Sequence, residues 1–435
     1  MIETTSRSKE RAFLVGVEIA SMHNLLTLED SLNELTLLAN TAGIEVVGQT
    51  TQKLHSPHPK TFIGSGKLEE INMLIEENEA NLLLFDEELS PRHQRELENI
   101  FGLKVRVLDR TALILDIFSQ HAHTREGALQ VELAQYEYRL PRLTRAWTHL
   151  ARQAGGGGGR SGSVGGVGLR GPGEKQLEVD RREIHRRIDH LKRDLENVRS
   201  HRLQHRRKRQ QTGLAVVALV GYTNAGKSTL LNCLSGAEVY VADHLFATLD
   251  PTTRKINLPD KRKALLTDTV GFIQKLPTTL VAAFRATLEE VSEADLLLHI
   301  IDISHPNAIA HSLAVFQTLS EIGAKHIPVL TVLNKVDLLQ NTEQARNSLE
   351  SFENAVAISA LTHIGIDDLL AAVNRILYED NYTVKLTLPY SEGNLISMIH
   401  NFGVVENIEY KNKFVIITAK IPGRFLARYH NYINE

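Results

Sequence analysis

The sequence contains little cysteine and no long apolar run, and each shortage excludes a class of protein. Cys233 is the single cysteine among 435 residues, which excludes an intramolecular disulfide and a cysteine-rich zinc site. No window approaches the roughly 18 consecutive apolar residues that a membrane span requires. The first residues, Met1 to Thr4, also lack the basic-then-apolar order of a secretory signal. We therefore expect a cytoplasmic protein with no membrane span.

A strong charge of one sign is also lacking. The net charge is −3, with 42% hydrophobic and 23% charged residues, which is typical of soluble globular proteins. The charge of the whole chain therefore does not indicate a nucleic-acid binder. At roughly 100–200 residues per domain, the length corresponds to about three domains.

Residues 1–110 are predicted to form a small α/β domain. Short strand-like runs at residues 13–19, 45–48, 82–86 and 105–108 alternate with helical patterns. This alternation is typical of a largely parallel sheet.

Two local signals in this domain concern the starts of helices. Ser90 followed by Pro91 fits an N-cap and a first helical position. Gly64-Ser65-Gly66-Lys67 resembles the end of a phosphate loop, but no glycine stands five positions before Gly66. We therefore interpret this segment as a turn that leads into a helix.

Residues 111–212 are predicted to form an antiparallel helical hairpin. Two apolar stripes recur there at spacings of three, four and seven residues, which lines one face of a helix. The first stripe comprises Leu129, Leu133, Tyr136, Leu140, Leu143, Trp147 and Leu150, and the second comprises Leu177, Ile184, Ile188, Leu191, Leu195 and Val198. Pro141 should kink the first helix. Eleven of the nineteen residues 155–173 are glycine, so we expect a mobile tip loop at residues 154–173.

The second helix of the hairpin is basic. Residues 174–211 carry thirteen Lys/Arg against seven Asp/Glu. One interpretation is a solvated helix whose basic last turn complements the helix dipole. The other is a contact surface for RNA phosphates. Arg160 and Arg170 within the glycine-rich loop favour RNA, because a loop that becomes ordered only on a phosphate backbone would have this composition.

A phosphate-binding loop follows the hairpin. The apolar run 214–220 ends in G-x-x-x-x-G-K-S between a strand and a helix, as the motif requires. Its residues are Gly221, Tyr222, Thr223, Asn224, Ala225, Gly226, Lys227 and Ser228. Backbone N–H groups of such a loop wrap the β-phosphate. Lys227 would place its charge between the β- and γ-phosphates, and Ser228 would offer its hydroxyl to magnesium.

A second apolar strand ends in the D-x-x-G sequence Asp268, Thr269, Val270 and Gly271. Asp268 can hold magnesium through a water molecule. The N–H of Gly271 can sense the γ-phosphate, because glycine permits a close backbone approach.

Two further elements predict that guanine is the base. Asn334, Lys335, Val336 and Asp337 follow a strand at residues 328–333. The Asp337 carboxylate can accept both N–H groups of the guanine edge, while the Lys335 stem covers the ring and Asn334 ties the loop together. Ser359, Ala360 and Leu361 follow a strand at residues 355–358, where the Ala360 N–H can bind the guanine carbonyl.

The four elements together predict a GTP-binding domain at residues 213–379. Its expected fold is that of a P-loop GTPase, a mostly parallel sheet flanked by helices, and its expected activity is hydrolysis of GTP to GDP and phosphate. Residues 380–435 suggest a further small α/β domain, with strands near residues 384–388 and 414–418, to which we assign no role. Cys233, within the helix after the phosphate loop, is interpreted as a small core residue.

These motifs resemble those of the translation-factor-related GTPases, and the extended pattern resembles the HflX family within that group. The match runs from about residue 10 to about residue 380 in the same order. The residues that carry it, besides the motifs above, are Thr124-Arg125-Glu126-Gly127-Ala128-Leu129-Gln130-Val131-Glu132-Leu133-Ala134, Leu169-Arg170-Gly171-Pro172-Gly173-Glu174-Lys175-Gln176-Leu177-Glu178 with Asp180-Arg181-Arg182, Leu245-Phe246-Ala247-Thr248-Leu249-Asp250-Pro251-Thr252, and Asp268-Thr269-Val270-Gly271-Phe272-Ile273.

The resemblance implies roles for further site residues. It identifies Thr248, flanked by Phe246, Ala247, Leu249 and Asp250, as the threonine that joins Ser228 on magnesium when GTP is bound. On chemistry alone, Thr252 and Thr253 would serve equally well. Lys227, Thr248 and Gly271 would then act on the γ-phosphate. In related GTPases an asparagine at the position of Asn224 helps to hold a monovalent cation, which raises the hypothesis of a potassium site.

The residue after Gly271 predicts how hydrolysis is controlled. This position usually carries a glutamine that orients the attacking water, whereas here it is Phe272, which cannot form a hydrogen bond. Gln274 follows two residues later and is expected to point elsewhere. We therefore expect slow intrinsic hydrolysis and a partner that reorders the switch segments. In the family that the sequence resembles, the ribosome stimulates hydrolysis.

The resemblance also implies a biological role and a partner. It implies a GTP-dependent switch that binds the large ribosomal subunit and its RNA where translation factors bind, and that separates the subunits of stalled or idle ribosomes under stress. We expect a monomer. Two alternatives are a GTP-gated scaffold for RNA processing or RNA modification, and a regulatory switch that binds protein without RNA.

Overall fold

The computed structural model describes residues 10–20, 25–102, 104–145, 172–211, 214–236, 245–246, 250–259, 262–275, 290–339, 352, 355–379 and 381–433. The chain divides into two compact units. The first comprises residues 1–202 with 275–283, and the second comprises residues 203–274 with 284–435. In the part of the chain that is described, no helix is both long and apolar enough to cross a membrane.

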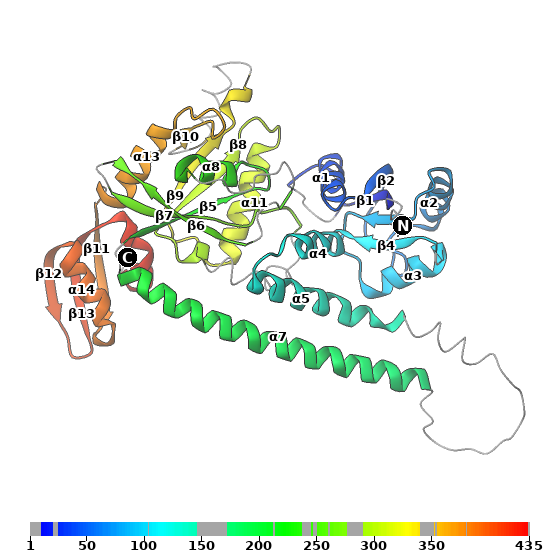
Figure 1. Ribbon diagram of the computed structural model, residues 1–435, viewed down its shortest axis with the longest axis horizontal. Helices are drawn as coiled ribbons and strands as arrows, with labels where there is room; N and C mark the ends of the chain where they lie inside the picture. Colours follow the sequence, from blue (N-terminus) through cyan, green and yellow to red (C-terminus); the bar gives the residue numbers. More distant parts are fainter. Residues whose placement is uncertain are drawn as a thin grey trace, which may run out of the picture. The chain divides into compact units, whose positions relative to one another are not determined.

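The first unit begins with a four-stranded parallel sheet in the order β2-β1-β3-β4 (Figure 1). Its strands are β1 Arg11–Ile19, β2 Glu45–Leu54, β3 Leu82–Phe85 and β4 Arg106–Asp109, and its helices are α1 Leu28–Thr41, α2 Ser65–Glu77, α3 Pro91–Phe101 and α4 Arg110–His121. The apolar runs of β1 and β3 are buried in the core. The predicted α/β domain with a parallel sheet is confirmed.

The helix starts of this unit follow from local side chains. The Ser90 hydroxyl accepts a hydrogen bond from the His93 N–H, and Pro91 is the first residue of α3. Gly64 precedes α2 in an extended conformation, so the Gly64–Lys67 segment is the predicted turn before a helix. The prediction for β2 was too short, because this edge strand continues to Leu54 with alternating half-exposed polar residues in place of an apolar run.

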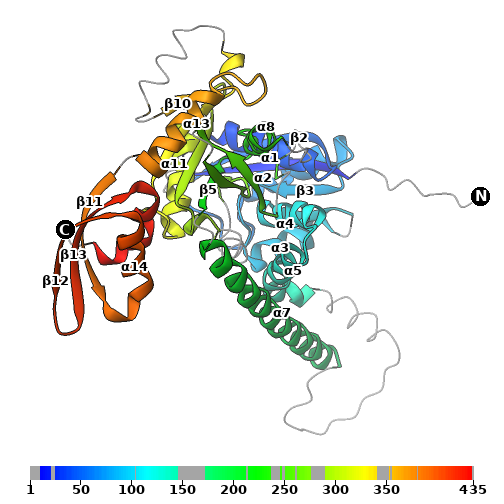
Figure 2. The same cartoon turned by 60° about the vertical axis from the view of Figure 1, so that its left-hand side comes forward.

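The helical hairpin is present in the described residues. Helix α5 spans Arg125–Arg139, the 3-10 helix η1 spans Leu140–Arg145, and α7 spans Pro172–Gln211. Figures 1 and 2 show α5 and α7 side by side, running in opposite directions. Their stripes meet in one apolar cluster around Leu133, Ile188 and Leu191.

The ends of these helices differ from the prediction in two details. Helix α5 stops before Pro141 and passes into η1, where a kink within a longer helix was expected, because proline cannot donate the helical hydrogen bond. Helix α7 already begins at Pro172, which suits a first helical position, so the last two residues of the predicted loop are helical. Trp147, Leu150 and the remainder of the loop lie outside the described residues.

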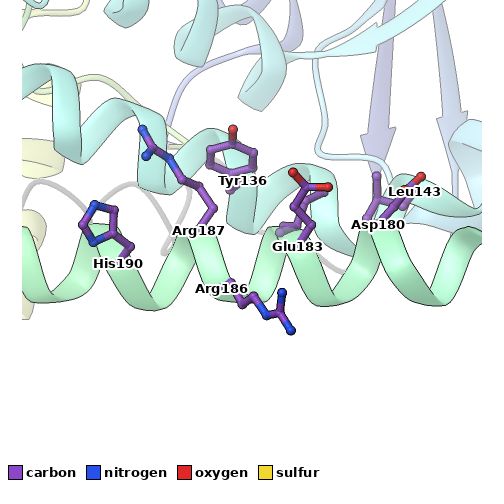
Figure 3. A pocket seen from close by; sticks show the side chains of 8 residues that line it. Tyr136, Leu143, Asp180, Glu183, Arg186, Arg187 and His190 are labelled. Carbon is purple, nitrogen blue, oxygen red and sulfur yellow. The ribbon is translucent and has the colours of Figure 1, made fainter.

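The surface of the hairpin carries both signs of charge. Arg187 pairs with Glu132 at 2.7 Å and Lys192 pairs with Glu137 at 2.9 Å, which joins α7 to α5. Near the start of α7 an open groove of about 490 Å³ separates Tyr136 and Leu143 from the side chains of α7 (Figure 3). Because its α7 wall carries acidic Asp180 and Glu183 as well as basic Arg186 and Arg187, this groove is not a uniformly basic surface.

The second unit contains a six-stranded sheet in the order β10-β9-β8-β5-β7-β6. All neighbours are parallel except the edge pair β6 and β7. The strands are β5 Ala215–Gly221, β6 Thr252–Asn257, β7 Lys263–Asp268, β8 Leu296–Asp302, β9 Val329–Asn334 and β10 Ala355–Ala357, and the main helices are α8 Lys227–Ser235, α11 Ala308–Glu321 and α13 Ile366–Asn374. This is the predicted mostly parallel sheet flanked by helices.

A small antiparallel sheet in the order β11-β13-β12 ends the chain. Its strands are β11 Asn381–Pro389, β12 Val404–Tyr410 and β13 Phe414–Pro422, and α14 Gly393–Phe402 packs beside them (Figure 2). The two strands expected near residues 384–388 and 414–418 are confirmed, each as part of a longer strand.

Candidate nucleotide-binding site

The parallel arrangement of the strands brings the sequence motifs together at the carboxyl ends of the sheet. Strands β5, β7, β8 and β9 are parallel neighbours, and they end at Gly221, Asp268, Asp302 and Asn334. The carboxyl ends of such strands are where ligands bind in open α/β sheets. The loops that follow these strands therefore form the candidate site.

Close packing requires glycine at two positions of the phosphate loop. At Gly221 an added Cβ would lie 2.4 Å from the backbone oxygen of Ile300. At Gly226 the φ angle is +93°, and an added Cβ would lie 2.3 Å from the side-chain nitrogen of Asn334. Because both contacts are shorter than any side chain tolerates, the two glycines let the loop turn tightly against its neighbours.

Lys227 lies beneath this loop with its ammonium group directed at backbone oxygens. Its Nζ donates hydrogen bonds to the carbonyls of Gly221 at 3.1 Å and Tyr222 at 2.7 Å. Burial lowers the pKa of Lys227 to about 8, although nearby Asp268 opposes this shift. A bound phosphate would favour the charged amine, because opposite charges stabilise each other strongly in a buried site.

Ser228 and Asp268 supply an oxygen donor set beside Lys227. The Ser228 hydroxyl donates a 2.6 Å hydrogen bond to the Asp268 carboxylate, which is fully buried at the end of β7. Hydroxyl and carboxylate oxygens are the ligand types that Mg²⁺ prefers. The donor set fits magnesium bound together with a triphosphate, since phosphate oxygens and water supply the remaining ligands.

The segment after Asp268 packs against the phosphate loop. The Phe272 N–H donates to the Gly221 carbonyl at 3.1 Å, and the Thr223 N–H donates to the Phe272 carbonyl at 2.8 Å. At Gly271 an added Cβ would lie 2.8 Å from the Thr223 side chain and 3.1 Å from the Lys227 ammonium. Only glycine therefore fits between the loop and the segment that leads to Phe272.

Asn334 links the phosphate loop to the two elements at the other end of the site. Its side-chain nitrogen donates to the Ala225 carbonyl at 2.9 Å, and its side-chain oxygen accepts the Ala360 N–H at 3.0 Å. Since Asn334 is itself 2% exposed, both bonds are shielded from water. Three loops that are far apart in the sequence are thus held together by one amide.

The remaining residues of this end are more accessible. Lys335 has a left-handed backbone with φ +67°, and its Nζ pairs with the Asp302 carboxylate at 2.7 Å. Asp337 lies in the 3-10 helix η3 Val336–Leu338 with an exposed side chain, and Leu361 is 74% exposed. The exposed Asp337 carboxylate can thus be reached by a ligand from solvent.

The structure describes two of the three threonines that were considered as magnesium ligands beside Ser228. Ala247, Thr248 and Leu249 lie outside the described residues, whereas Phe246 is buried and Asp250 is described. Thr252 and Thr253 belong to β6, and the Thr253 hydroxyl lies 3.0 Å from that of Thr267 in the neighbouring strand.

Sequence reasoning missed two residues of β8 that lie near the site, one affected by Lys227 and one paired with Lys335. His299 interrupts the apolar run of β8, is 1% exposed, and has a pKa lowered to about 4, first by burial and then by Lys227. Asp302, the partner of Lys335, ends the same strand. The polar residue within an apolar run and the acidic residue at its end were the available signals.

The interpretation of Cys233 as a core residue is wrong. Its side chain is only half-buried, and its Sγ lies 3.0 Å from Nδ1 of His363. Burial raises the pKa of this thiol. The residue lies on the last turns of the short helix α8, facing the loop after Ala360 rather than the sheet.

Three family models match the chain in succession. They are described as GTP-binding GTPase N-terminal over residues 29–119, GTP-binding GTPase Middle Region over residues 121–209, and 50S ribosome-binding GTPase over residues 216–335. The matched segments follow one another from the N-terminal sheet to the strand that ends in Asn334.

Relatives named GTPase HflX are similar over nearly the whole chain. The protein of Caldanaerobacter subterraneus subsp. tengcongensis is 45% identical over 432 residues, which is 99% of this chain and 96% of the relative. That of Escherichia coli is 46% identical over 398 residues, 91% of this chain and 90% of the relative. A solved GTP-binding protein from Sulfolobus solfataricus in complex with GDP aligns over 84% of this chain and 98% of its own, with 25% identity and a TM-score of 0.43.

Proposed function

This chain belongs to the HflX family of GTPases, and from that premise we propose that it is a GTP-dependent switch that acts on the ribosome. Its enzymatic activity is the hydrolysis of GTP. We propose that the GTP form binds the large ribosomal subunit and its RNA in the cytoplasm and separates the subunits of stalled or idle ribosomes under stress. The protein would act as a monomer.

The nucleotide would lie along the edge of the sheet from the phosphate loop to Ala360. The observation that carries this assignment is the pair of Asn334 hydrogen bonds, because they join the phosphate-binding and base-binding loops. Residues Gly221 to Ser228 would wrap the phosphates, with Phe246 to Asp250 and Asp268 to Gly271 around the γ-phosphate. Residues Asn334 to Asp337 and Ser359 to Leu361 would hold guanine.

Magnesium would be held by oxygen ligands beside Lys227. We propose Ser228 and Thr248 as its protein ligands, with Asp268 placed behind a water molecule. The Ser228–Asp268 hydrogen bond supports this, because it already sets a hydroxyl and a carboxylate at one point of the site. When bound, the ion would neutralise charge on the phosphates.

Asn224 is the proposed residue for a monovalent cation. Its backbone is in the left-handed region with φ +59°, at the tip of the loop that would cover the phosphates. A potassium ion there would add positive charge where negative charge develops during hydrolysis. Equal turnover in potassium and in sodium buffers would exclude this role.

The hairpin supplies the proposed contact with ribosomal RNA. Helix α7 has 40 residues, about 60 Å at roughly 1.5 Å per residue, and it is joined directly to the glycine-rich segment. Exposed arginines such as Arg181, Arg186 and Arg193 lie along it. Such an arm could reach into an RNA cleft while the GTPase unit stays at the surface of the subunit.

Hydrolysis is proposed to be slow until the ribosome acts on the switch segment. Phe272, which replaces the usual water-orienting glutamine, is 3% exposed and pairs with the phosphate loop. A side chain without hydrogen-bonding groups cannot orient the attacking water. The ribosome would supply or expose such a group by reordering this segment.

Co-sedimentation with ribosomal particles tests the proposal directly. The full chain should pellet with large subunits in the presence of a non-hydrolysable GTP analogue and remain largely in the supernatant with GDP. Large subunits should also raise GTP turnover strongly, whereas tRNA or short RNA should not. Equal stimulation by short RNA would instead favour an RNA-processing or RNA-modification scaffold.

A deletion separates binding of nucleotide from action on the ribosome. Removing residues 155–171 leaves α7 intact from Pro172 and leaves every element of the nucleotide site in place. GTP affinity should survive, while the stimulation of hydrolysis and the splitting of ribosomes should fall. Full retention of both ribosomal effects would contradict the proposed role of the arm.

A further inference from the structure

Three of the hydrogen bonds between described residues hold residues 272–274 to the phosphate loop. Two of them are between backbone groups, from the Phe272 N–H to the Gly221 carbonyl and from the Thr223 N–H to the Phe272 carbonyl. The third runs from the Gln274 N–H to the hydroxyl of Tyr222 at 3.0 Å. Only this third bond depends on a side chain, so only this bond can be removed by substitution without altering the backbone.

The Tyr222 side chain is held rigidly in place. It is 6% exposed, and its ring stacks on the ring of His311 from α11, with centroids 3.9 Å apart and an interplanar angle of 5°. His311 in turn contacts His305, with ring centroids 4.5 Å apart. A stacked and buried ring has little rotational freedom, so its hydroxyl presents a fixed acceptor to the Gln274 N–H.

These contacts affect the groups that could position the attacking water. Water attack requires a hydrogen-bonding group close to the γ-phosphate, on the segment that follows Gly271. The Phe272 side chain has no such group, and its N–H and carbonyl are bonded to the phosphate loop. The Gln274 N–H is bonded to Tyr222. In this arrangement both N–H groups are already used as donors, and the Phe272 carbonyl is fixed in direction by its bond to the Thr223 N–H, so the segment cannot turn a donor towards a water molecule.

We propose that Tyr222 is a positioning residue whose hydroxyl holds residues 272–274 in a slowly hydrolysing arrangement. The ribosome then stimulates hydrolysis by releasing this segment from the phosphate loop. The inference rests on the proposed function, because it explains how slow intrinsic turnover and stimulation by the large subunit arise in one site.

The test is the Tyr222→Phe variant of the full chain, which keeps the ring and its stack and removes only the hydroxyl. In single-turnover hydrolysis without ribosomes, its rate should rise about three- to tenfold. This factor corresponds to the free energy that one intramolecular hydrogen bond typically contributes to holding the segment in place. GTP affinity should change less than about twofold, because the loop backbone is unaltered. Stimulation by large subunits should fall by the same factor by which the basal rate rises.

A matched control removes a tyrosine hydroxyl elsewhere. Tyr390 donates a 2.9 Å hydrogen bond to the Lys411 carbonyl in the C-terminal antiparallel sheet region, so Tyr390→Phe should leave the hydrolysis rate unchanged. A second variant, His311→Ala, removes the ring that braces Tyr222 and should raise the rate in the same direction as Tyr222→Phe.

Hydrogen exchange measures whether loss of the hydroxyl releases this segment while the neighbouring strand stays intact. The amides of residues 272–275 should exchange faster in Tyr222→Phe, with the exchange of β7 unchanged. An unaltered or lower hydrolysis rate in Tyr222→Phe would overturn the proposal. If wild-type protein is not stimulated by large subunits, the proposed function fails, while the basal rate of Tyr222→Phe still decides the role of the hydroxyl.

Discussion

At the residue scale, we propose that guanine selection depends on one exposed carboxylate. Asp337 lies just after Asn334, whose side chain fixes the loop against Ala225 and Ala360. A carboxylate accepts both N–H groups of the guanine edge, and each such charged hydrogen bond contributes about 1.5–3 kcal/mol. On this proposal the identity of the base would depend more on Asp337 than on any other side chain of the site.

Asp337→Asn should weaken GTP binding at least about tenfold, since the amide cannot accept both guanine N–H groups. Its N–H₂ group should at the same time favour a base with a carbonyl at that position. We expect calorimetry to show a preference for XTP over GTP in the variant and the reverse in the wild type. Equal binding of GTP and ATP by the wild type would contradict the assignment of this residue.

We expect Lys227 to make GTP affinity dependent on pH. Burial lowers its pKa to about 8 in the free protein, and a bound triphosphate raises this pKa because it favours the charged amine. Below about pH 8 the amine is already charged and affinity does not depend on its titration. Above about pH 8 binding takes up a proton, so GTP affinity should fall as the pH rises.

Titration with a fluorescent GTP analogue from about pH 7 to about pH 9 checks this expectation. The matched control is Lys227→Arg, whose guanidinium remains charged throughout this range. The control should bind more weakly but should lack the additional loss of affinity above about pH 8. The same pH dependence in both proteins would assign the effect to another group.

Residue identities at the site were predictable where the signal is local in sequence. Gly221, Gly226, Lys227 and Ser228 stand at fixed spacings between a strand and a helix, and the structure places them in that context. The pairing of Lys335 with Asp302 could not be predicted, because it joins the residue after β9 to the last residue of β8, and these strands become neighbours only in the folded sheet.

At the element scale, the stability of the hairpin depends on a small apolar cluster. Leu191 is fully buried there, between Ile188 on the same helix and Leu133 on α5. Five partly buried apolar side chains pack against this cluster, and half of the 40 residues of α7 are charged. The arm should therefore be sensitive to single truncations at this point.

Leu191→Ala should destabilise the packing of α5 on α7 by about 2–5 kcal/mol, the usual cost of this truncation in a core. GTP affinity should be retained, while stimulation of hydrolysis by large subunits should fall. Val179→Ala on the same helix is the control, because Val179 is 52% exposed and should cost less than about 0.5 kcal/mol. Thermal unfolding and hydrogen exchange of residues 125–139 measure the difference, and equal effects of the two variants would argue against a packed hairpin.

Elements that are buried along their whole length could be predicted from the sequence, whereas partly exposed ones were harder to delimit. Apolar runs such as β5 and β8 identify buried strands. Strand β2 was underestimated, because an edge strand with one half-exposed face carries no apolar run. The end of α5 before Pro141 depends on how the chain leaves the helix, which a periodic pattern cannot specify.

At the scale of the whole molecule, the nearly neutral chain concentrates its positive charge on one helix. The net charge is −3, whereas residues 174–211 carry an excess of Lys/Arg. RNA binding through this helix would release counterions from the phosphates and weaken steeply with salt. A protein partner bound through apolar contacts would show little such dependence.

The double variant Arg181→Gln with Arg186→Gln should reduce the slope of log affinity against log salt concentration by about two, one for each lost phosphate contact. Both side chains are exposed, so the fold should be unaffected. Binding to large subunits at several salt concentrations gives the slopes. Unchanged slopes would place the RNA contact elsewhere, and salt-independent binding of the wild type would favour a protein partner.

The amide of Asn334 has a consequence for how spent nucleotide departs. One side chain bonds to Ala225 beside the proposed phosphate site and to Ala360 beside the proposed base site. A displacement of the loop at either end should therefore weaken the hydrogen bond at the other. We expect GDP to dissociate in a single exponential phase rather than base first and phosphates later. A protein that catalyses nucleotide exchange would then need to displace only the phosphate loop or only the loop of Ala360 to release both ends of the nucleotide.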